Sequence, residues 1–207
     1  NIRSSQDTLF LKEKELEGLP ENYKKERKQA DGTYAVDTSY PSYGPFMKLA
    51  ESDKSREMLR FKYNNRASES NIIVLDDILR NRMKLVKLLG YNSYAEYRTE
   101  DRMAKNPKNV WSFENDLKDK LRPKALQDVS EMLKIKSKRL KKKAEVIHPW
   151  EAGFYENLLK LEKYDLDGEE VKKYFEFNNV TQGLFTIYQT LFSVRFERVE
   201  NASVWHE

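Results

Sequence analysis

Residues 71–90 read NIIVLDDILRNRMKLVKLLG and form the most regular segment of the chain. The apolar residues recur at steps of three and four positions, at Ile72, Leu75, Leu79, Met83, Val86 and Leu89. That spacing places them on one face of an α-helix. We predict a helix that Asn71 caps and that ends at Gly90, a residue type common after the last helical turn. This segment indicates a mainly α fold.

Helix signals continue on both sides of this segment. Further N-terminal caps are predicted at Ser52, Ser93, Asn106 and Asp167. Glu96 gives Ser93 the spacing of a capping box. Pro107 follows Asn106 at the first helical position, where a missing N–H costs nothing. We expect Pro123 to kink or restart the helix that begins there, and a further helix to begin near Trp150.

The two ends of the chain are less regular. Near the start we predict a short helix from Asp7 or Thr8 to Leu16, a strand over Thr33–Val36, and an aromatic turn over Tyr40–Pro45. Near the end, residues 181–192 are apolar nearly all round and predict a buried helix. Residues 194–198 and 202–205 indicate short strands or an extended pair. We therefore expect residues 1–50 to hold the short N-terminal elements and residues 51–207 a helical scaffold, one incomplete domain assembly.

Composition supports long elements and excludes several classes of protein. The 207 residues include only 7 Gly and 6 Pro, and 39% are hydrophobic. The net charge of +4 comes from 38 basic and 34 acidic residues, which is no polycation for nucleic acid. No apolar run approaches the ~18 residues of a membrane span. There is no Cys, no initiator Met and no apolar leader, so we expect an intracellular, cytoplasmic or mitochondrial protein, processed or excised from a longer chain.

Histidine is scarce, which limits metal chemistry. The chain ends on His206-Glu207, the first half of a His-Glu-x-x-His zinc motif whose second half is absent. The other histidine, His148, lies 58 positions away, whereas catalytic zinc needs about three protein ligands. Asp165 and Asp167 lack the remaining ligands of a calcium loop, and Asp167 is better explained as a cap. No catalytic or metal residue is therefore predicted, and the substrate-binding residues stay unknown.

A basic run covers Lys134–Lys143, where seven of ten residues are cationic. Such a run could contact phosphates or an acidic membrane surface. No aromatic residue is interleaved for base stacking, and Glu131 and Glu145 flank the run. We interpret it as a solvated helix end or interhelix loop, with a nucleic-acid-binding helical protein as the competing hypothesis.

A series of short phrases, each weak alone, is informative in its order along the chain. The series includes Leu16-Glu17-Gly18-Leu19-Pro20, Asp31-Gly32-Thr33-Tyr34, Arg56, Arg66-Ala67, Leu88-Leu89-Gly90-Tyr91, Met103-Ala104-Lys105-Asn106-Pro107, Trp150 with Tyr155, Lys173-Tyr174-Phe175, Val180-Thr181-Gln182-Gly183-Leu184 and Val204-Trp205-His206-Glu207. The order resembles the thimet oligopeptidase, neurolysin and saccharolysin family of zinc metallopeptidases, with oligopeptidase A and the dipeptidyl carboxypeptidases as relatives. The departures are small: Glu151 stands where the family usually has Asp, and Phe154 where another Tyr is common.

The resemblance implies a helical ellipsoid with a deep channel, with zinc at its base and short peptides as substrates. In that family the zinc helix, its third ligand and the assisting Tyr and His all follow the Trp-His-Glu phrase. His206 and Glu207 are then scaffold residues, and no family site residue can be placed on this sequence. We expect zinc in the full-length enzyme but none bound by this chain, which should be inactive without a C-terminal catalytic segment. The expected partners are that segment and short peptides, with no nucleic acid and no membrane. A non-catalytic helical binding module built on the same scaffold is the alternative.

Overall fold

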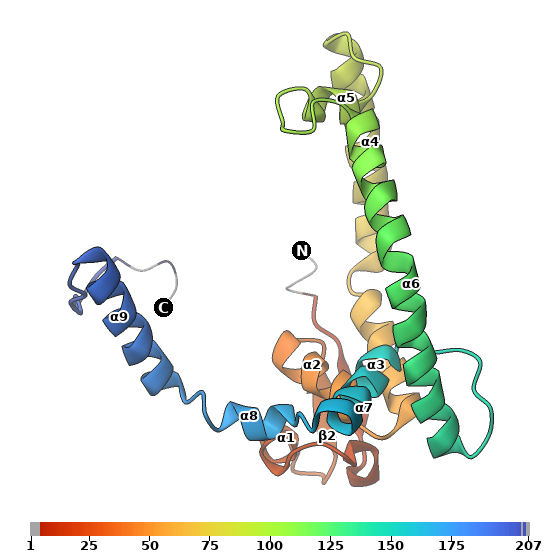
Figure 1. Cartoon of the computed structure of the whole chain (residues 1–207), viewed down its shortest axis with the longest axis vertical. Coiled ribbons are helices and arrows are strands. Elements are labelled where there is room, and N and C mark those ends of the chain that lie inside the picture. The colour runs from red at the N-terminus through yellow and green to blue at the C-terminus, as the bar shows by residue number, and fades with distance from the viewer. Residues whose placement is uncertain (1–4, 204, 206–207) are drawn as a thin grey trace. The chain divides into compact units, whose positions relative to one another are not determined.

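A computed structural model describes residues 5–203 and 205, and within them the only sheet has two strands. The mainly α prediction is confirmed (Figure 1). The elements in chain order are β1 (Thr8–Leu11), the 3-10 helix η1 (Glu13–Leu16), α1 (Glu21–Arg27), β2 (Tyr34–Asp37), α2 (Tyr40–Leu49), α3 (Asp53–Asn64), α4 (Ser68–Leu88), α5 (Tyr94–Thr99), α6 (Pro107–Leu140), α7 (Ala152–Tyr164), α8 (Gly168–Lys172) and α9 (Phe177–Phe192). The chain divides into two compact units, Asn1–Leu159 and Lys160–Glu207.

The core of the first unit forms on the two-stranded β1–β2 sheet, whose strands are joined through η1 and α1. The strands are antiparallel, with Thr8 opposite Asp37 and Leu11 opposite Tyr34. Side chains alternate across a strand, so Leu11 is buried while Phe10 is exposed. The buried cluster comprises Leu9, Leu11, Leu16, Leu19, Tyr23, Tyr34, Val36, Phe46, Met47, Ala50 and Leu59. The β1–β2 sheet, α2 and α3 therefore hold most of the main core.

The N-terminal elements confirm one sequence prediction and correct two others. The strand predicted over Thr33–Val36 is confirmed as β2, but the aromatic turn predicted over Tyr40–Pro45 is wrong, because these residues begin α2. The helix predicted from Asp7 or Thr8 to Leu16 is wrong, because residues 8–11 pair with β2 and only η1 is helical. The Asp7 carboxylate accepts the N–H of Thr8 and pairs with Lys62 of α3 at 2.8 Å, so it fixes the start of a strand. The pKa of Asp7 is lowered, chiefly by the hydrogen bond from Lys62.

Gly18 lies in the turn after η1, and we expect Gly18→Ala to be strongly destabilising. Its φ is +87°, and an added Cβ would overlap the carbonyl oxygen of Leu49. The left-handed backbone alone costs an L-residue about 1–2 kcal/mol, and the overlap adds to that cost. Gly32→Ala is the matched control, since Gly32 has a φ of +82° with nothing within 4 Å of the added Cβ. Urea denaturation should show a larger loss for Gly18→Ala, and equal losses would contradict the proposed overlap.

The predicted caps of the long helices are mostly confirmed. Ser52 accepts the N–H of Ser55 at 3.3 Å, and Asn106 accepts that of Asn109 at 2.9 Å. Ser93 accepts from Glu96 at 3.1 Å, but the Glu96 carboxylate takes the N–H of Asn92, so the reciprocal half of the capping box is displaced by one residue.

Two predictions about the long helices are corrected. Residues 71–88 are helical as predicted, but α4 begins at Ser68 rather than at Asn71, because Ala67 turns the chain in the left-handed region (φ 53°). Helix α6 runs through Pro123 over 34 residues, so the helix does not restart at this proline. At 1.5 Å per residue this helix is about 51 Å long. Helix α5 contacts both α4 and α6 and so joins the two long helices.

The second unit contains α8, α9 and the segment that follows them. The helix predicted over residues 181–192 is confirmed within α9, but its predicted burial is wrong, because none of the unit's described residues is buried. Its packing includes Phe185 stacked on Phe196 at 4.9 Å, and Gln189 accepting the N–H of Phe196. Residues 194–198 form no strand, and residues 204, 206 and 207 lie outside the described part, so the second predicted strand is only partly described.

Tyr23 of α1 gives the first unit a pH dependence. Burial raises the pKa of Tyr23 above its usual value of 10, and its hydroxyl donates to Ser42 O at 2.7 Å. A phenol whose folded-state pKa is raised contributes stability below the unfolded pKa, and this stability is lost as the pH rises above about 10. Tyr23→Phe should cost about 1 kcal/mol at pH 7 and flatten the fall in unfolding free energy between pH 9 and pH 11. Parallel alkaline slopes for the two proteins, measured in urea, would contradict this role.

Candidate functional site

The residues that the sequence singled out for metal chemistry are not brought together. The ring of His148 stacks on Trp150, with centroids 4.5 Å apart. Asp167 caps α8 through the N–H of Glu169, as predicted. Asp165 directly follows α7 with a φ of 49°, while His206 and Glu207 lie outside the described residues. Within residues 5–203 and 205, no group of three or more His, Cys, Asp or Glu side chains lies together in a way that could hold a metal ion.

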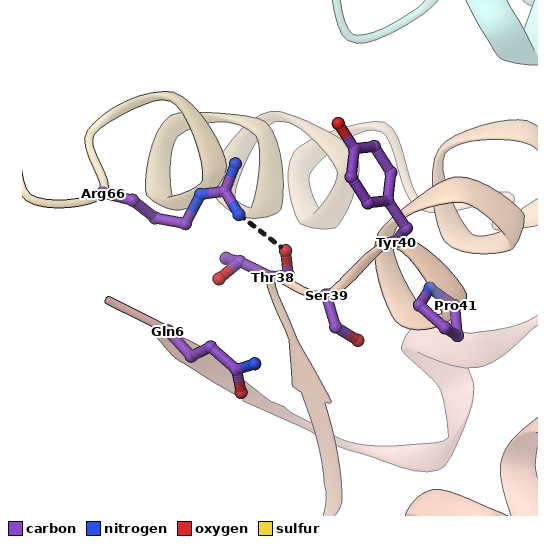
Figure 2. A pocket seen from close by; sticks show the side chains of 6 residues that line it. All are labelled: Gln6, Thr38, Ser39, Tyr40, Pro41 and Arg66. Atoms are coloured by element: carbon purple, nitrogen blue, oxygen red, sulfur yellow. Dashed lines mark hydrogen bonds between the residues drawn. The ribbon is translucent and has the colours of Figure 1, made fainter. Parts of the chain in front are cut away.

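A pocket of about 390 Å³ opens where the chain enters β1 and leaves β2 (Figure 2). Its lining residues are Gln6, Thr38, Ser39, Tyr40, Pro41 and Arg66. Thr38 is fixed from both sides, because its N–H donates to Asp7 O and its hydroxyl accepts the N–H of Asp7. Ser39 precedes α2 and donates its N–H to the Asp37 carboxylate at 2.8 Å. The floor of the pocket is therefore the rigid junction between β2 and α2.

Arg66 brings a positive charge to this pocket. Its Nε donates to Tyr63 O at 2.8 Å, and its Nη1 donates to Thr38 O at 3.1 Å. The guanidinium carbon also lies 3.8 Å from the centroid of the Tyr63 ring. Arg66 thereby ties the end of α3 to the end of β2. Figure 2 shows the second terminal nitrogen turned away from the Thr38 carbonyl.

Three tyrosines support the guanidinium. Tyr63 stacks on Tyr43 with centroids 3.9 Å apart, and Tyr40 meets Tyr63 edge-on at 6.3 Å. Burial raises the pKa of Tyr43, and the positive charge of Arg60 is the main opposing influence. The Tyr63 ring beside Arg66 is thus packed against Tyr43 and Tyr40, and the exposed Tyr40 ring also lines the pocket.

Arg56 is the most buried charged side chain in the described part, with 1% of its surface exposed. Its guanidinium donates to Trp150 O at 3.2 Å, to Ala50 O and to Asp53 at 2.9 Å. It also lies over the ring of Phe154, 4.1 Å from the centroid. Burial lowers the pKa of Arg56 from its usual value, and Asp53 opposes that shift. This side chain connects α3 to the start of α7.

A buried ion pair connects α6 to α7. Lys136 donates to Glu151 Oε2 at 2.6 Å and to Val146 O at 2.9 Å, and both charged residues are less than 10% exposed. The N–H of His148 also donates to Glu151 Oε2, at 2.7 Å. The Glu151 carboxylate therefore binds both Lys136 of α6 and the backbone of the 141–151 loop, which gives Glu151 a structural role.

Arg66, Arg56 and the Lys136–Glu151 ion pair each connect separate elements of the first unit, and none of these roles was predicted from the sequence. The basic run was interpreted as solvated, and it does end α6 at Leu140, but Lys136 within it is buried. Arg139 of the same run pairs with Glu51. Ile135 among the lysines is the signal that one helix face turns inward there, and it is buried. Arg56 and Arg66 were recognised only as parts of the family resemblance, without a role.

Comparison with known proteins identifies the class of molecule that this scaffold represents. Residues 46–207 match peptidase family M3. Saccharolysin of Saccharomyces cerevisiae is 32% identical over 221 residues, covering 100% of this chain and 31% of saccharolysin. Oligopeptidase A of Haemophilus influenzae is 31% identical, covering 97% of this chain and 31% of the relative. Organellar oligopeptidase A, chloroplastic/mitochondrial, of Arabidopsis thaliana is 30% identical, covering 97% and 27%.

The chain belongs to peptidase family M3, and the resemblance seen in the sequence is confirmed. It spans about a third of the length of saccharolysin and of oligopeptidase A. Among the described residues, no helix is both long and apolar enough to cross a membrane.

Proposed function

We propose that this chain is part of the helical scaffold of a zinc-dependent oligopeptidase that hydrolyses short peptides. The zinc ligands and the general base of the whole protein would come from sequence outside residues 1–207, because these residues contain no His-Glu-x-x-His motif. The relatives include an organellar enzyme, so the proposal covers the cytosol and organelles alike.

The observation that carries the proposal is the match over the whole chain, supported by the exposure of apolar residues on the long helices. Ile72 and Leu75 of α4 are each at least half exposed, as are Trp111 and Phe113 of α6. Large apolar surfaces of this kind mark interfaces in soluble proteins. We assign these faces to contact with the remaining segments of a longer peptidase.

Helix α9 supports the same assignment. Phe177, Ile187 and Leu191 are all more than half exposed, on a strongly amphipathic helix whose unit has no buried described residue. A surface helix normally buries its apolar stripe against a core. The stripe of α9 therefore fits a role as a docking element for the rest of the enzyme.

A peptidase assay tests the proposal. An internally quenched peptide of about ten residues should be cleaved by the whole protein with zinc, and a chelator should abolish the cleavage. The 207-residue chain alone should not cleave it. Cleavage by this chain alone would contradict the assignment of the catalytic residues. Binding of the peptide by the whole protein without cleavage would favour the non-catalytic helical module.

A further inference from the structure

We propose that the Arg66 pocket binds the carboxylate of a small ligand with an apolar body, with the carboxylate on the guanidinium. The inference does not depend on peptidase activity, since it rests on the pocket of the first unit alone. A short peptide with a free carboxyl terminus and a simple aliphatic acid share this chemistry.

The first argument is that Arg66 is held in place while no described carboxylate neutralises its charge. Among the described residues it forms no ion pair with a carboxylate, whereas Arg27 and Arg56, which are also held by Tyr or Phe rings, pair with Glu26 and Asp53. Two of its five N–H groups donate to carbonyl oxygens. Within the part of the chain that the structure describes, Nη2 and the second N–H of Nη1 have no acceptor, so they can present the parallel donors that a carboxylate accepts.

The second argument is the chemistry of the pocket wall. Pro41 and the Tyr40 ring, which is 74% exposed, give an apolar side for a ligand body. Gln6 and Ser39 add an amide and a hydroxyl. The volume of about 390 Å³ lies at the lower end of the range of small-molecule sites, roughly 300–1,000 Å³. The pocket therefore fits a ligand of one or two residues rather than a large one.

The third argument favours a carboxylate over a phosphate. Arg66 is the only cationic residue of the described lining. Two carboxylates lie beside the pocket, each already engaged: Asp7 with Lys62, and Asp37 with the N–H of Ser39. They would repel an anion of charge near −2 more than a singly charged group.

Titration of the 207-residue chain by ¹H–¹⁵N NMR tests the proposal. N-acetyl-leucine should shift the amide signals of Ser39 and Tyr40 in a saturable way, and N-acetyl-leucinamide should not. Arg66→Gln should weaken binding about tenfold, through loss of the charge-assisted bonds. Arg80→Gln removes an exposed arginine of α4 and should leave binding unchanged. Comparison with hexanoate distinguishes a peptide carboxyl terminus from a simple aliphatic acid as the ligand. A saturable response to either acid supports the site.

Equal shifts with the acid and the amide would overturn the proposal, as would unchanged affinity in a folded Arg66→Gln variant. The acid–amide comparison uses the unmodified chain, so it decides the question even if that variant does not fold. Displacement of N-acetyl-leucine by an equal concentration of inorganic phosphate would overturn the preference for carboxylate.

Discussion

Arg56→Leu is expected to lower the free energy of unfolding of the first unit by about 4 kcal/mol. The substitution removes donors from the carbonyl oxygens of Trp150 and Ala50 inside the protein, where water cannot replace them fully. It also removes the guanidinium from the face of Phe154. Asp53 is about half exposed and can be hydrated, so most of the loss comes from the buried carbonyl groups.

Urea denaturation followed by far-ultraviolet circular dichroism measures this loss. Arg80→Leu is the matched control, since Arg80 forms an exposed ion pair with Asp76 on α4, and such pairs contribute less than about 1 kcal/mol. A loss below that of the control in Arg56→Leu would show that the carbonyl groups find other donors and that Arg56 is not an anchor.

Glu151→Ala is expected to have the second largest effect, a loss of about 3 kcal/mol. The substitution leaves Lys136 buried without its counter-ion and leaves the N–H of His148 without its acceptor. The double variant Lys136→Met/Glu151→Leu should recover about half of the loss, because an apolar pair avoids the desolvation of the lone ammonium group. The 141–151 loop should also become more accessible to protease in Glu151→Ala than in the double variant.

A double-mutant cycle in urea measures the coupling between Lys136 and Glu151. The control is Asp116→Ala, which breaks an exposed pair with Lys120 on the same helix and should change stability by less than about 0.5 kcal/mol. If the double variant is less stable than Glu151→Ala, the ion pair stabilises the fold beyond what apolar packing supplies, contrary to the expectation.

The helical architecture could be predicted from local signals because most helix ends depend on nearby residues. Ser52, Ser93 and Asn106 each cap a helix through the N–H three positions along, and Gly90 has the expected positive φ. The start of α4 could not be predicted in this way, since Ala67 carries no capping side chain and its left-handed backbone has no sequence signal. Thr8–Leu11 was taken for a helix because its partner strand lies about 25 residues further along.

The buried charges could not be predicted from the sequence because each depends on contacts across long separations. Lys136 reaches Glu151 only after the loop folds back, and Glu151 was noticed only as a departure from the family pattern. The pocket likewise joins residues that lie just before β1, between β2 and α2, at the start of α2, and just after α3. The exposure of α9 was also unpredictable, because an apolar helix has the same sequence pattern whether its partner lies inside or outside the segment.

The bond from Arg56 to Trp150 spans 94 positions, which has a consequence for synthesis on the ribosome. At translation rates of about 5–20 residues per second, roughly 5–20 s separate the appearance of these two residues. During that interval the β1–β2 sheet, α2 and α3 can pack together, while the guanidinium of Arg56 still lacks its acceptor, the carbonyl oxygen of Trp150. Final closure of the first core is therefore a late event of translation, set by the arrival of the segment that begins α7.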